Sequence, residues 1–221
     1  KILKEKNILR IADVFKSKAD FNSSIKFLDS TYSIHVTPEI KNKLIEMHLF
    51  SGDPDTSLFL INELFKTVMA DNAYFNDLME LRDFINHFYI NADEKSKEGF
   101  IGFLKSESLL KQRKVFEANQ LLSHINKNNN NETISPLLSL RRAIILTRLK
   151  KYNEALSELN LLEDTIFADK GIIMSGQIHE RFYNDPSKAS EFYLRIINDY
   201  SDSIFSEPIR YHLRKLKDNE K

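Results

Sequence analysis

The side chains that most often carry acid–base chemistry or bind metals are scattered along this chain. No two histidines have the spacing of a His-Glu-x-x-His helix, and none forms a close pair that a metal ion could bridge. The nearest approach to an acid–base pair is His179-Glu180, but adjacent helical residues point about 100° apart. We therefore predict no enzymatic activity, no metal and no cofactor, with a packing role for the histidines: His35, His48, His87, His124, His179 and His212.

Composition removes further classes of function. The absence of cysteine excludes disulfide bonds, thiolate nucleophiles and the commonest structural zinc ligands. Lys plus Arg and Asp plus Glu each number 32, so no net charge draws the chain to nucleic acid, which we do not expect as a partner. No apolar run approaches the roughly 18 residues of a membrane-spanning helix. Because the chain begins at Lys1 without a leader, we expect it to be a piece of a longer protein.

Three apparent motifs have ordinary structural interpretations. Gly99-Phe100-Ile101-Gly102 lacks the preceding strand and the glycine pattern of a phosphate-binding loop, and indicates close helix packing instead. Sixteen phenylalanines and eight tyrosines at helical spacing indicate a core more than a base-stacking surface. The basic stretch from Arg210 to Lys217 is typical of the solvated face of a terminal helix.

The elements that must carry any binding surface are predicted to be helices. Five glycines, five prolines and no Asn-Gly or Asp-Gly dipeptide leave out the turn signals of a β fold, so we predict an all-α chain. Between Pro136 and Tyr200, two helical hairpins follow the same plan. Ala143 and Gly176 precede the two turns, while Ala155 and Ala189 follow them and lie 34 residues apart. That period is the length of a tetratricopeptide repeat.

The N-terminal part shows the same spacing with different residues. Ala12 and Ser24 are 12 residues apart, as are Ala143 and Ala155, and Ser57 follows Ser24 by 33. Two further helices are predicted from their caps. Thr37 precedes Pro38, Asp53 precedes Pro54, and Gly52 ends the helix between them.

The middle and the end of the chain depart from this repeat spacing. We predict an apolar helix from Asp71 to Tyr89 and one long helix from Glu94 to Lys111 that serves both its neighbours, with a local twist or kink there. The run Asn126–Asn131 predicts an exposed loop. A final helix over Ile204–Leu216 is expected to close the array, with Ile204 on its apolar side.

The segment from Gly176 through Asp185-Pro186-Ser187 to Ser203 resembles the last repeat of bacterial cell-envelope members of the tetratricopeptide repeat family. The resemblance implies a right-handed α-superhelix of about five to six helix-turn-helix repeats with a C-terminal capping helix. It implies a single domain over residues 1–221, with divergent repeats in 1–90 and more regular ones in 94–217. It further implies a bacterial periplasmic or envelope-associated setting, with the cytoplasm as the alternative.

In this family the first helices of the repeats line a concave groove that holds a peptide or a partner subunit. The version that grips the carboxylate end of chaperone tails needs Lys and Asn where this chain has Leu9 and Asp13, so that activity is not expected. The same registration predicts a mixed apolar and charged groove in the C-terminal half: Phe100, Phe103, Glu107, Leu110, Lys111, Leu140, Ile144, Arg148, Ile173, Gln177, Glu180 and Arg181.

The leading hypothesis is therefore a non-enzymatic scaffold or adaptor for protein–protein interaction. Two alternatives stay open at this point. The chain could be the regulatory or substrate-presenting arm of an enzyme whose catalytic domain lies upstream of Lys1. It could also be an RNA-binding helical repeat, which would require a continuous positive stripe along the groove.

Overall fold

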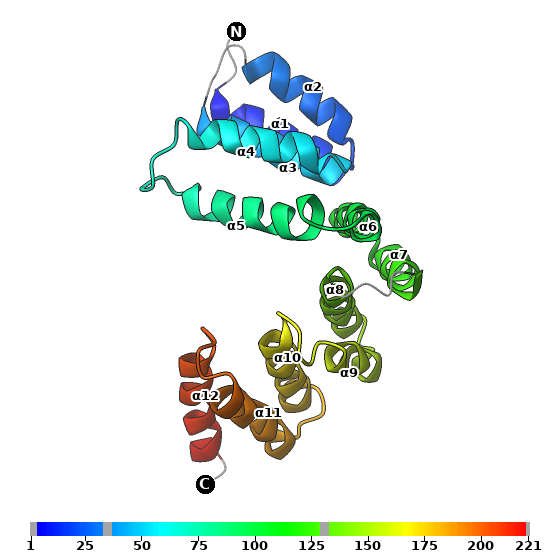
Figure 1. The fold of residues 1–221 in the computed structure, drawn as a ribbon, viewed down its shortest axis with the longest axis vertical. Helices are drawn as coiled ribbons and strands as arrows, with labels where there is room; N and C mark the ends of the chain where they lie inside the picture. The colour runs from blue at the N-terminus through cyan, green and yellow to red at the C-terminus, as the bar shows by residue number, and fades with distance from the viewer. Residues whose placement is uncertain (1–3, 33–36, 129–132, 220–221) are drawn as a thin grey trace. The chain divides into compact units, whose positions relative to one another are not determined.

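The computed structural model describes residues 4–32, 37–128 and 133–219, and their regular structure is entirely helical (Figure 1). The predicted all-α fold is confirmed. The chain divides into two compact units, unit 1 (Lys1–Ile134) and unit 2 (Ser135–Lys221). Among the described residues, no helix is both long enough and apolar enough to cross a bilayer.

Unit 1 is built mainly from helices that pack on their neighbours in the chain. Helix α3 packs on α1, α2, α4 and α6, so it lies at the centre of the unit, and its inward side chains Ile40 and Met47 are fully buried. The helices are α1 (Glu5–Ser17), α2 (Phe21–Tyr32), α3 (Pro38–Ser51), α4 (Pro54–Phe65), α5 (Phe75–Ile85), the π-helical turn η1 (Asn86–Ile90), α6 (Glu94–Lys111) and α7 (Val115–Asn128).

The caps predicted for α3 and α4 are confirmed. The Thr37 side chain accepts a hydrogen bond from the Ile40 backbone N–H, and Asp53 accepts one from Thr56, with a proline following each cap. Gly52 ends α3 with a φ of 88°, a left-handed conformation that glycine adopts without a Cβ penalty. These local signals fix the turn between two helices that pack on each other.

Small residues lie at the helix contacts within the hairpins, as their spacing predicts. Ser24 and Ser57 are fully buried. The Ser24 hydroxyl donates to the Ala12 carbonyl across 3.5 Å, and the Ser57 hydroxyl donates to the Ile45 carbonyl across 3.1 Å, each acceptor being 12 residues earlier. A hydroxyl group can reach the partner helix's backbone only where the two helices approach closely. The 12-residue spacing therefore marks the contact between paired helices.

The irregular middle of unit 1 is built around aromatic side chains. The long helix predicted over Glu94–Lys111 is confirmed as α6, whereas the helix expected from Asp71 begins only at Phe75 and continues as the π-helical turn η1. The irregularity thus precedes α6. The rings of Phe84, Phe88, Phe100 and Phe103 pack there with centroids 5.0 to 6.2 Å apart.

Tyr89 of η1 fixes this turn to α4. Its hydroxyl donates a hydrogen bond of 2.8 Å to Asp55 Oδ2. Burial, together with the hydrogen bond to this carboxylate, raises the pKa of Tyr89 to about 12, so the phenol stays protonated at neutral pH.

Unit 2 contains the two hairpins with the clearest repeat spacing, followed by a final helix. Ala143, Ala155 and Ala189 are fully buried, and Gly176 faces the ring of Tyr193. Helix α10 packs on α9 and α11, and α11 packs on α12. The helices are α8 (Ser135–Arg148), α9 (Tyr152–Asn160), α10 (Ala168–Arg181), α11 (Pro186–Asp199) and α12 (Ser206–Asn219).

Two sequence predictions about element ends are wrong. Asn126 to Asn128 belong to α7 and not to a loop, because Ile125 packs at Gly102 of α6 and the helix continues past it; Asn129–Asn131 lie outside the described residues. Ile204 lies before α12 and is 83% exposed, so it is not on the buried side of that helix. The buried contacts of α12 come from Ile209 and Leu213.

Candidate functional site

Unit 1 carries an open pocket between helices that are far apart in the sequence, here termed the α1/α3/α5 pocket. It encloses about 520 Å³. Leu9 and Asp13 come from α1, Tyr74 and Leu81 from α5 and its N-terminal cap, and the rest of the lining comes from α3: Glu39, Asn42, Lys43, Ile45, Glu46, Leu49 and Phe50. The lining combines apolar side chains with charged ones, as peptide-binding surfaces do.

An ion-pair network joins α1 to α3 along this pocket. Lys43 Nζ lies 2.9 Å from Asp13 Oδ1 and 2.7 Å from Glu46 Oε2, and the other oxygen of Glu46 pairs with Lys16. Burial alone would lower the pKa of Lys43, but the hydrogen bonds to Glu46 and Asp13 raise it above its usual value. Burial alone would raise the pKa of Glu46, but the bonds from Lys16 and Lys43 lower it. Lys43 and Glu46 are therefore both held in their charged forms at neutral pH.

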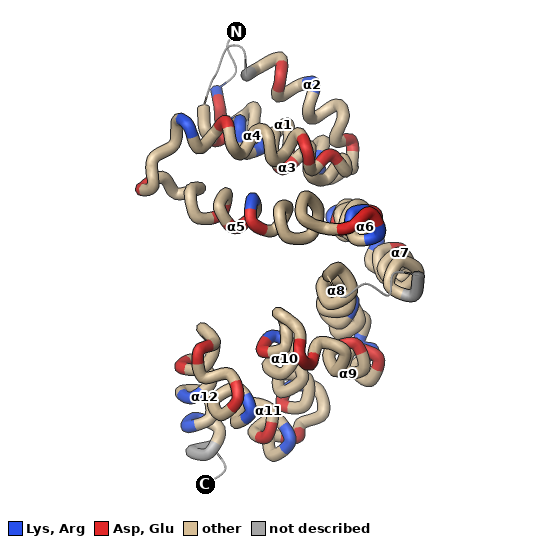
Figure 2. The backbone as a smooth tube through the Cα atoms, viewed as in Figure 1, with Lys and Arg blue, Asp and Glu red and all other residues tan. Residues whose placement is uncertain are grey.

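The network decides which ligand groups the pocket can take. Lys43 is the single lysine of the lining and its ammonium is already shared by two carboxylates. The pocket therefore offers no unpaired ammonium to a terminal carboxylate. Its acidic residues Asp13, Glu39 and Glu46 also interrupt the positive stripe that RNA binding would require. Figure 2 shows acidic and basic residues interspersed along α1 to α3.

A second pocket of unit 1, here termed the lysine pocket, encloses about 650 Å³. It lies where the α1–α2 turn and the end of α3 meet α6. Its lining includes two lysines, Lys18 and Lys105, and one carboxylate, Asp20. The remaining lining residues are Ala19, Phe21, Asn22, Phe50, Ser51, Gly52, Ile101, Ser108 and Gln112.

Phe50 forms part of both pockets. Its ring stacks on Phe21 at 5.9 Å, and the ammonium groups of Lys16 and Lys111 lie 5.3 and 5.5 Å from its centroid. Both distances are within the range of cation–π attraction. Lys111, a residue predicted to line a groove, is thus exposed beside the wall that the two pockets share.

The other predicted groove residues of unit 1 differ in how far they are buried. Phe100 is fully buried in the aromatic core and Phe103 is nearly so, so neither presents a surface to a partner. The prediction fails for these two because both rings pack against Phe84 of α5, and the Phe100 ring also packs against Tyr89 of η1. Glu107 and Leu110 are half-buried on the same helix.

The predicted groove residues of unit 2 lie on α8 and α10. Leu140, Ile144 and Gln177 are half-buried, and Arg148 and Arg181 are exposed, as a binding surface would require. Ile173 belongs instead to the core formed with α11 and α12. Glu180 accepts a hydrogen bond from Tyr193, so its carboxylate is engaged inside the unit.

The adjacent residues His179 and Glu180 of α10 point toward different parts of unit 2. The His179 ring stacks on Phe192 at 5.5 Å, while Glu180 Oε2 lies 2.9 Å from His212 Nε2. The two adjacent side chains therefore have different partners. Within residues 4–32, 37–128 and 133–219, no three side chains of the His, Cys, Asp and Glu types are grouped to hold a metal ion.

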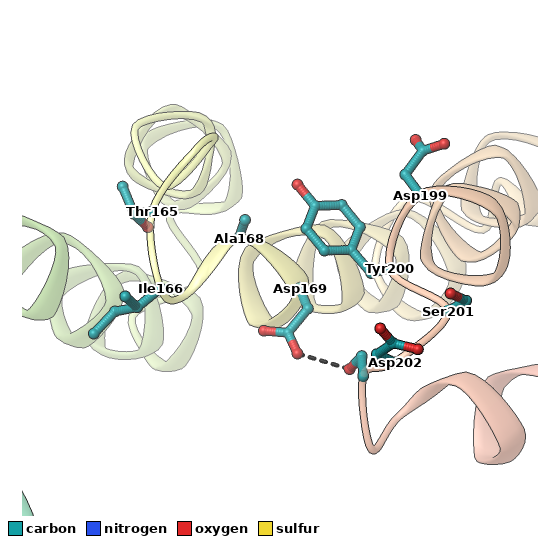
Figure 3. A pocket seen from close by; sticks show the side chains of 9 residues that line it. Thr165, Ile166, Ala168, Asp169, Asp199, Tyr200, Ser201 and Asp202 are labelled. Carbon is teal, nitrogen blue, oxygen red and sulfur yellow. Dashed lines mark hydrogen bonds between the residues drawn. The ribbon is translucent and has the colours of Figure 1, made fainter.

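Unit 2 has an acidic pocket of about 380 Å³ between the loops that precede α10 and α12 (Figure 3). Asp169 Oδ2 accepts a hydrogen bond of 2.7 Å from Ser203 Oγ, and Asp202 lies beside this pair, while Asp199 points away from it. The remaining lining residues are Thr165, Ile166, Ala168, Tyr200 and Ser201. The hydrogen bond joins the first turn of α10 to the loop before α12 and gives Asp169 a structural role.

Comparison with protein-family models, curated proteins and solved structures gives no match to this chain. The resemblance to tetratricopeptide repeats therefore stays a prediction from the residues.

Proposed function

We propose that this protein is a non-enzymatic scaffold that binds a peptide or a partner subunit in the α1/α3/α5 pocket. The observation that carries the proposal is the composition of this pocket. Helices α1, α3 and α5, which belong to successive parts of unit 1, contribute apolar side chains from Leu9, Leu49 and Leu81 to a lining that also carries charged side chains. A partner segment would place a few apolar side chains in the pocket, while the rim charges set its register.

The fold that supports this function is proposed to be a right-handed α-superhelix of tetratricopeptide-type repeats. Two observations support it. The small residues at the predicted contacts of the unit 2 hairpins, Ala143, Ala155 and Ala189, are fully buried. Ser24 and Ser57 reach the backbone of the preceding helix in unit 1. The bacterial envelope setting implied by the resemblance is part of the same proposal.

The charge network makes the pocket a rigid receptor. Because Lys43 and Glu46 are each held by two partners, their side chains are already ordered before a ligand arrives. Binding then costs less side-chain entropy than it would on a surface of free lysines and glutamates. Glu39, at the start of α3, is the rim residue that a basic group of the ligand would meet.

A displayed library of random peptides, panned against the full chain, tests this function. Selected peptides are expected to lose affinity by roughly tenfold or more in Tyr74→Ala and in Glu39→Lys, which change one apolar and one charged lining residue. The matched comparison is the double variant Arg148→Glu/Arg181→Glu, which reverses two exposed charges on the surface predicted in unit 2. Circular dichroism checks that each variant keeps its helicity.

The same experiment separates two binding surfaces. Loss of binding in the unit 2 variant alone would move the site to α8 and α10, as the sequence predicted. A library that yields no peptide with an affinity sensitive to either set of variants would contradict the proposal.

A further inference from the structure

The lysine pocket differs from the α1/α3/α5 pocket because its lysines are not in ion pairs with carboxylates of the described residues. Lys18 and Lys105 are both exposed, one on the α1–α2 turn and one on α6. Within the described part of the chain, no ion pair joins either ammonium to a carboxylate. The one lysine that lines the first pocket, Lys43, is paired with protein carboxylates, whereas the two lysines of the second pocket remain available to a ligand.

The remaining groups of the lysine pocket do not cancel this charge. Asp20 is the one carboxylate of the lining, and its Oδ1 accepts a hydrogen bond of 3.2 Å from the Ser23 backbone at the start of α2. Lys111 adds a further ammonium beside the Phe50 ring. Positive charge therefore exceeds negative charge around the pocket.

Neutral polar groups complete a surface that can receive carboxylates. The Ser51 hydroxyl of the lining already donates to the His48 carbonyl. The amide groups of Asn22 and Gln112 and the hydroxyl group of Ser108 also belong to the lining. Such groups can donate hydrogen bonds to an anion once the lysines have attracted it. With about 650 Å³, the pocket has room for more than one acidic side chain.

We infer that the lysine pocket docks an acidic segment, rich in Asp and Glu, of the same partner that occupies the α1/α3/α5 pocket. The inference rests on the proposed function. Since Phe50 forms part of both pockets, one extended chain can pass from the apolar pocket to the basic one. The partner is then an apolar stretch joined directly to a cluster of carboxylates.

A peptide fits this surface better than a nucleic acid does. A nucleic acid carries a negative charge at every phosphate, and along the same path it would meet Asp13 and Glu39 in the adjoining pocket. A peptide can confine its negative charge to one end. The lysine pocket has an excess of positive charge and the α1/α3/α5 pocket does not. Together they therefore favour a ligand whose negative charge lies at one end.

The test uses the full chain, isotope-labelled for NMR and titrated separately with poly-L-glutamate, poly-L-glutamine and poly(U) RNA. Poly-L-glutamate is expected to shift the backbone amides of Asn22, Gly52 and Lys105, and to do so less at high salt. The variant Lys18→Glu/Lys105→Glu should weaken this binding by roughly tenfold or more. The control Lys4→Glu/Lys6→Glu makes the same change of charge at the other end of α1 and should leave it unchanged.

Each other outcome has a definite meaning. Shifts spread over the whole surface, equal effects of the two double variants, or tighter binding of poly(U) at the same amides would overturn the acidic-segment inference. Displayed peptides that bind the α1/α3/α5 pocket would still uphold the proposed function in those cases. If neither displayed peptides nor poly-L-glutamate bind unit 1, both proposals fail.

Discussion

The hydroxyl group of Tyr193 donates a hydrogen bond of 2.7 Å to Glu180 Oε2, and this contact ties α11 to α10 in the core of unit 2. His212 of α12 reaches the same oxygen at 2.9 Å. Burial would raise the pKa of Glu180, but the bonds from His212 and Tyr193 lower it below its usual value. One carboxylate oxygen thus joins three successive helices.

Replacing Tyr193 with Phe should destabilise the chain by about 1–2 kcal/mol, because a buried hydrogen bond to a charged group is lost. Burial and the Glu180 carboxylate raise the pKa of Tyr193 above its ordinary value of 10.0. The unfolded chain therefore releases this proton first, and the stability of the wild type should fall as pH rises above 10. Urea unfolding across this range should show a shallower fall in Tyr193→Phe. Tyr211→Phe, at an exposed ring, is the control.

Gly176 should resist substitution by alanine. A Cβ at this position would lie 2.5 Å from Cε1 of the buried Tyr193 ring, which has little freedom to move. Overpacking costs about 1–3 kcal/mol and outweighs the gain in helix propensity of about 1 kcal/mol. At Gly102 the added Cβ would meet the terminal methyl group of Ile125, which can rotate away. Gly102→Ala should therefore be neutral or stabilising, and thermal unfolding of both variants tests the contrast.

The network on α1 and α3 predicts a loss of stability in acid. Because the pKa of Glu46 in the folded chain is lowered from its ordinary value of 4.5, the stabilisation is present above that pH and is lost as pH falls through the folded value. Glu46→Gln removes this contribution and should flatten the acid side of the stability curve. Glu39→Gln, at a glutamate without such partners, should leave the curve unchanged. Parallel curves for wild type and Glu46→Gln would contradict the assignment.

Arg142 and Glu158 form a buried ion pair within the first hairpin of unit 2, with side chains 15% and 11% exposed. Burial raises the pKa of Glu158, and Arg142 and Ser139 oppose this only in part. Arg142→Met should cost about 3–5 kcal/mol because it leaves a buried carboxylate unpaired. The double variant Arg142→Met/Glu158→Leu should recover most of that loss. A double-mutant cycle by urea unfolding measures the coupling.

Local sequence signals predicted the helices and their caps well. The predicted groove depended instead on aligning the chain with the repeat pattern, and at some of the aligned positions the side chain is buried in the core. Thr37 and Asp53 were predictable as caps because the cap, the proline and the first turn lie within a few residues of each other. Phe100 and Ile173 were misplaced because a large apolar side chain at a groove position is also a good core residue, and periodicity gives the face of a helix without saying which neighbour covers it.

The lining of the α1/α3/α5 pocket could have been found from the same register. Leu9 and Asp13 were already assigned to the first groove helix, and α3 continues that face with Asn42, Lys43 and Glu46. What the sequence could not show is that Lys43 is paired with Asp13, 30 residues away. Such a pairing follows from the packing of α1 on α3, which sets the distance between the two side chains.

Substitutions at Ser57 test whether the small residues mark close helix contacts. Ser57 donates to the Ile45 carbonyl across 3.1 Å and to Asp53 across 2.9 Å, and it is fully buried. Ser57→Ala keeps the close approach and should cost about 1 kcal/mol or less, because both acceptors are backbone carbonyls and the Asp53 carbonyl still accepts a hydrogen bond from the backbone N–H of residue 57. Ser57→Leu must push α4 away from α3 and should cost roughly 2 kcal/mol or more.

The comparison for these variants is Ser30→Leu, which places the same side chain on the exposed face of α2. Thermal unfolding should rank the three variants with Ser57→Leu far below the others. If Ser57→Leu unfolds at the temperature of Ser30→Leu, α3 and α4 have room between them at this point. The 12-residue spacing would then not mark a helix contact, and the repeat architecture would lose its main support in unit 1.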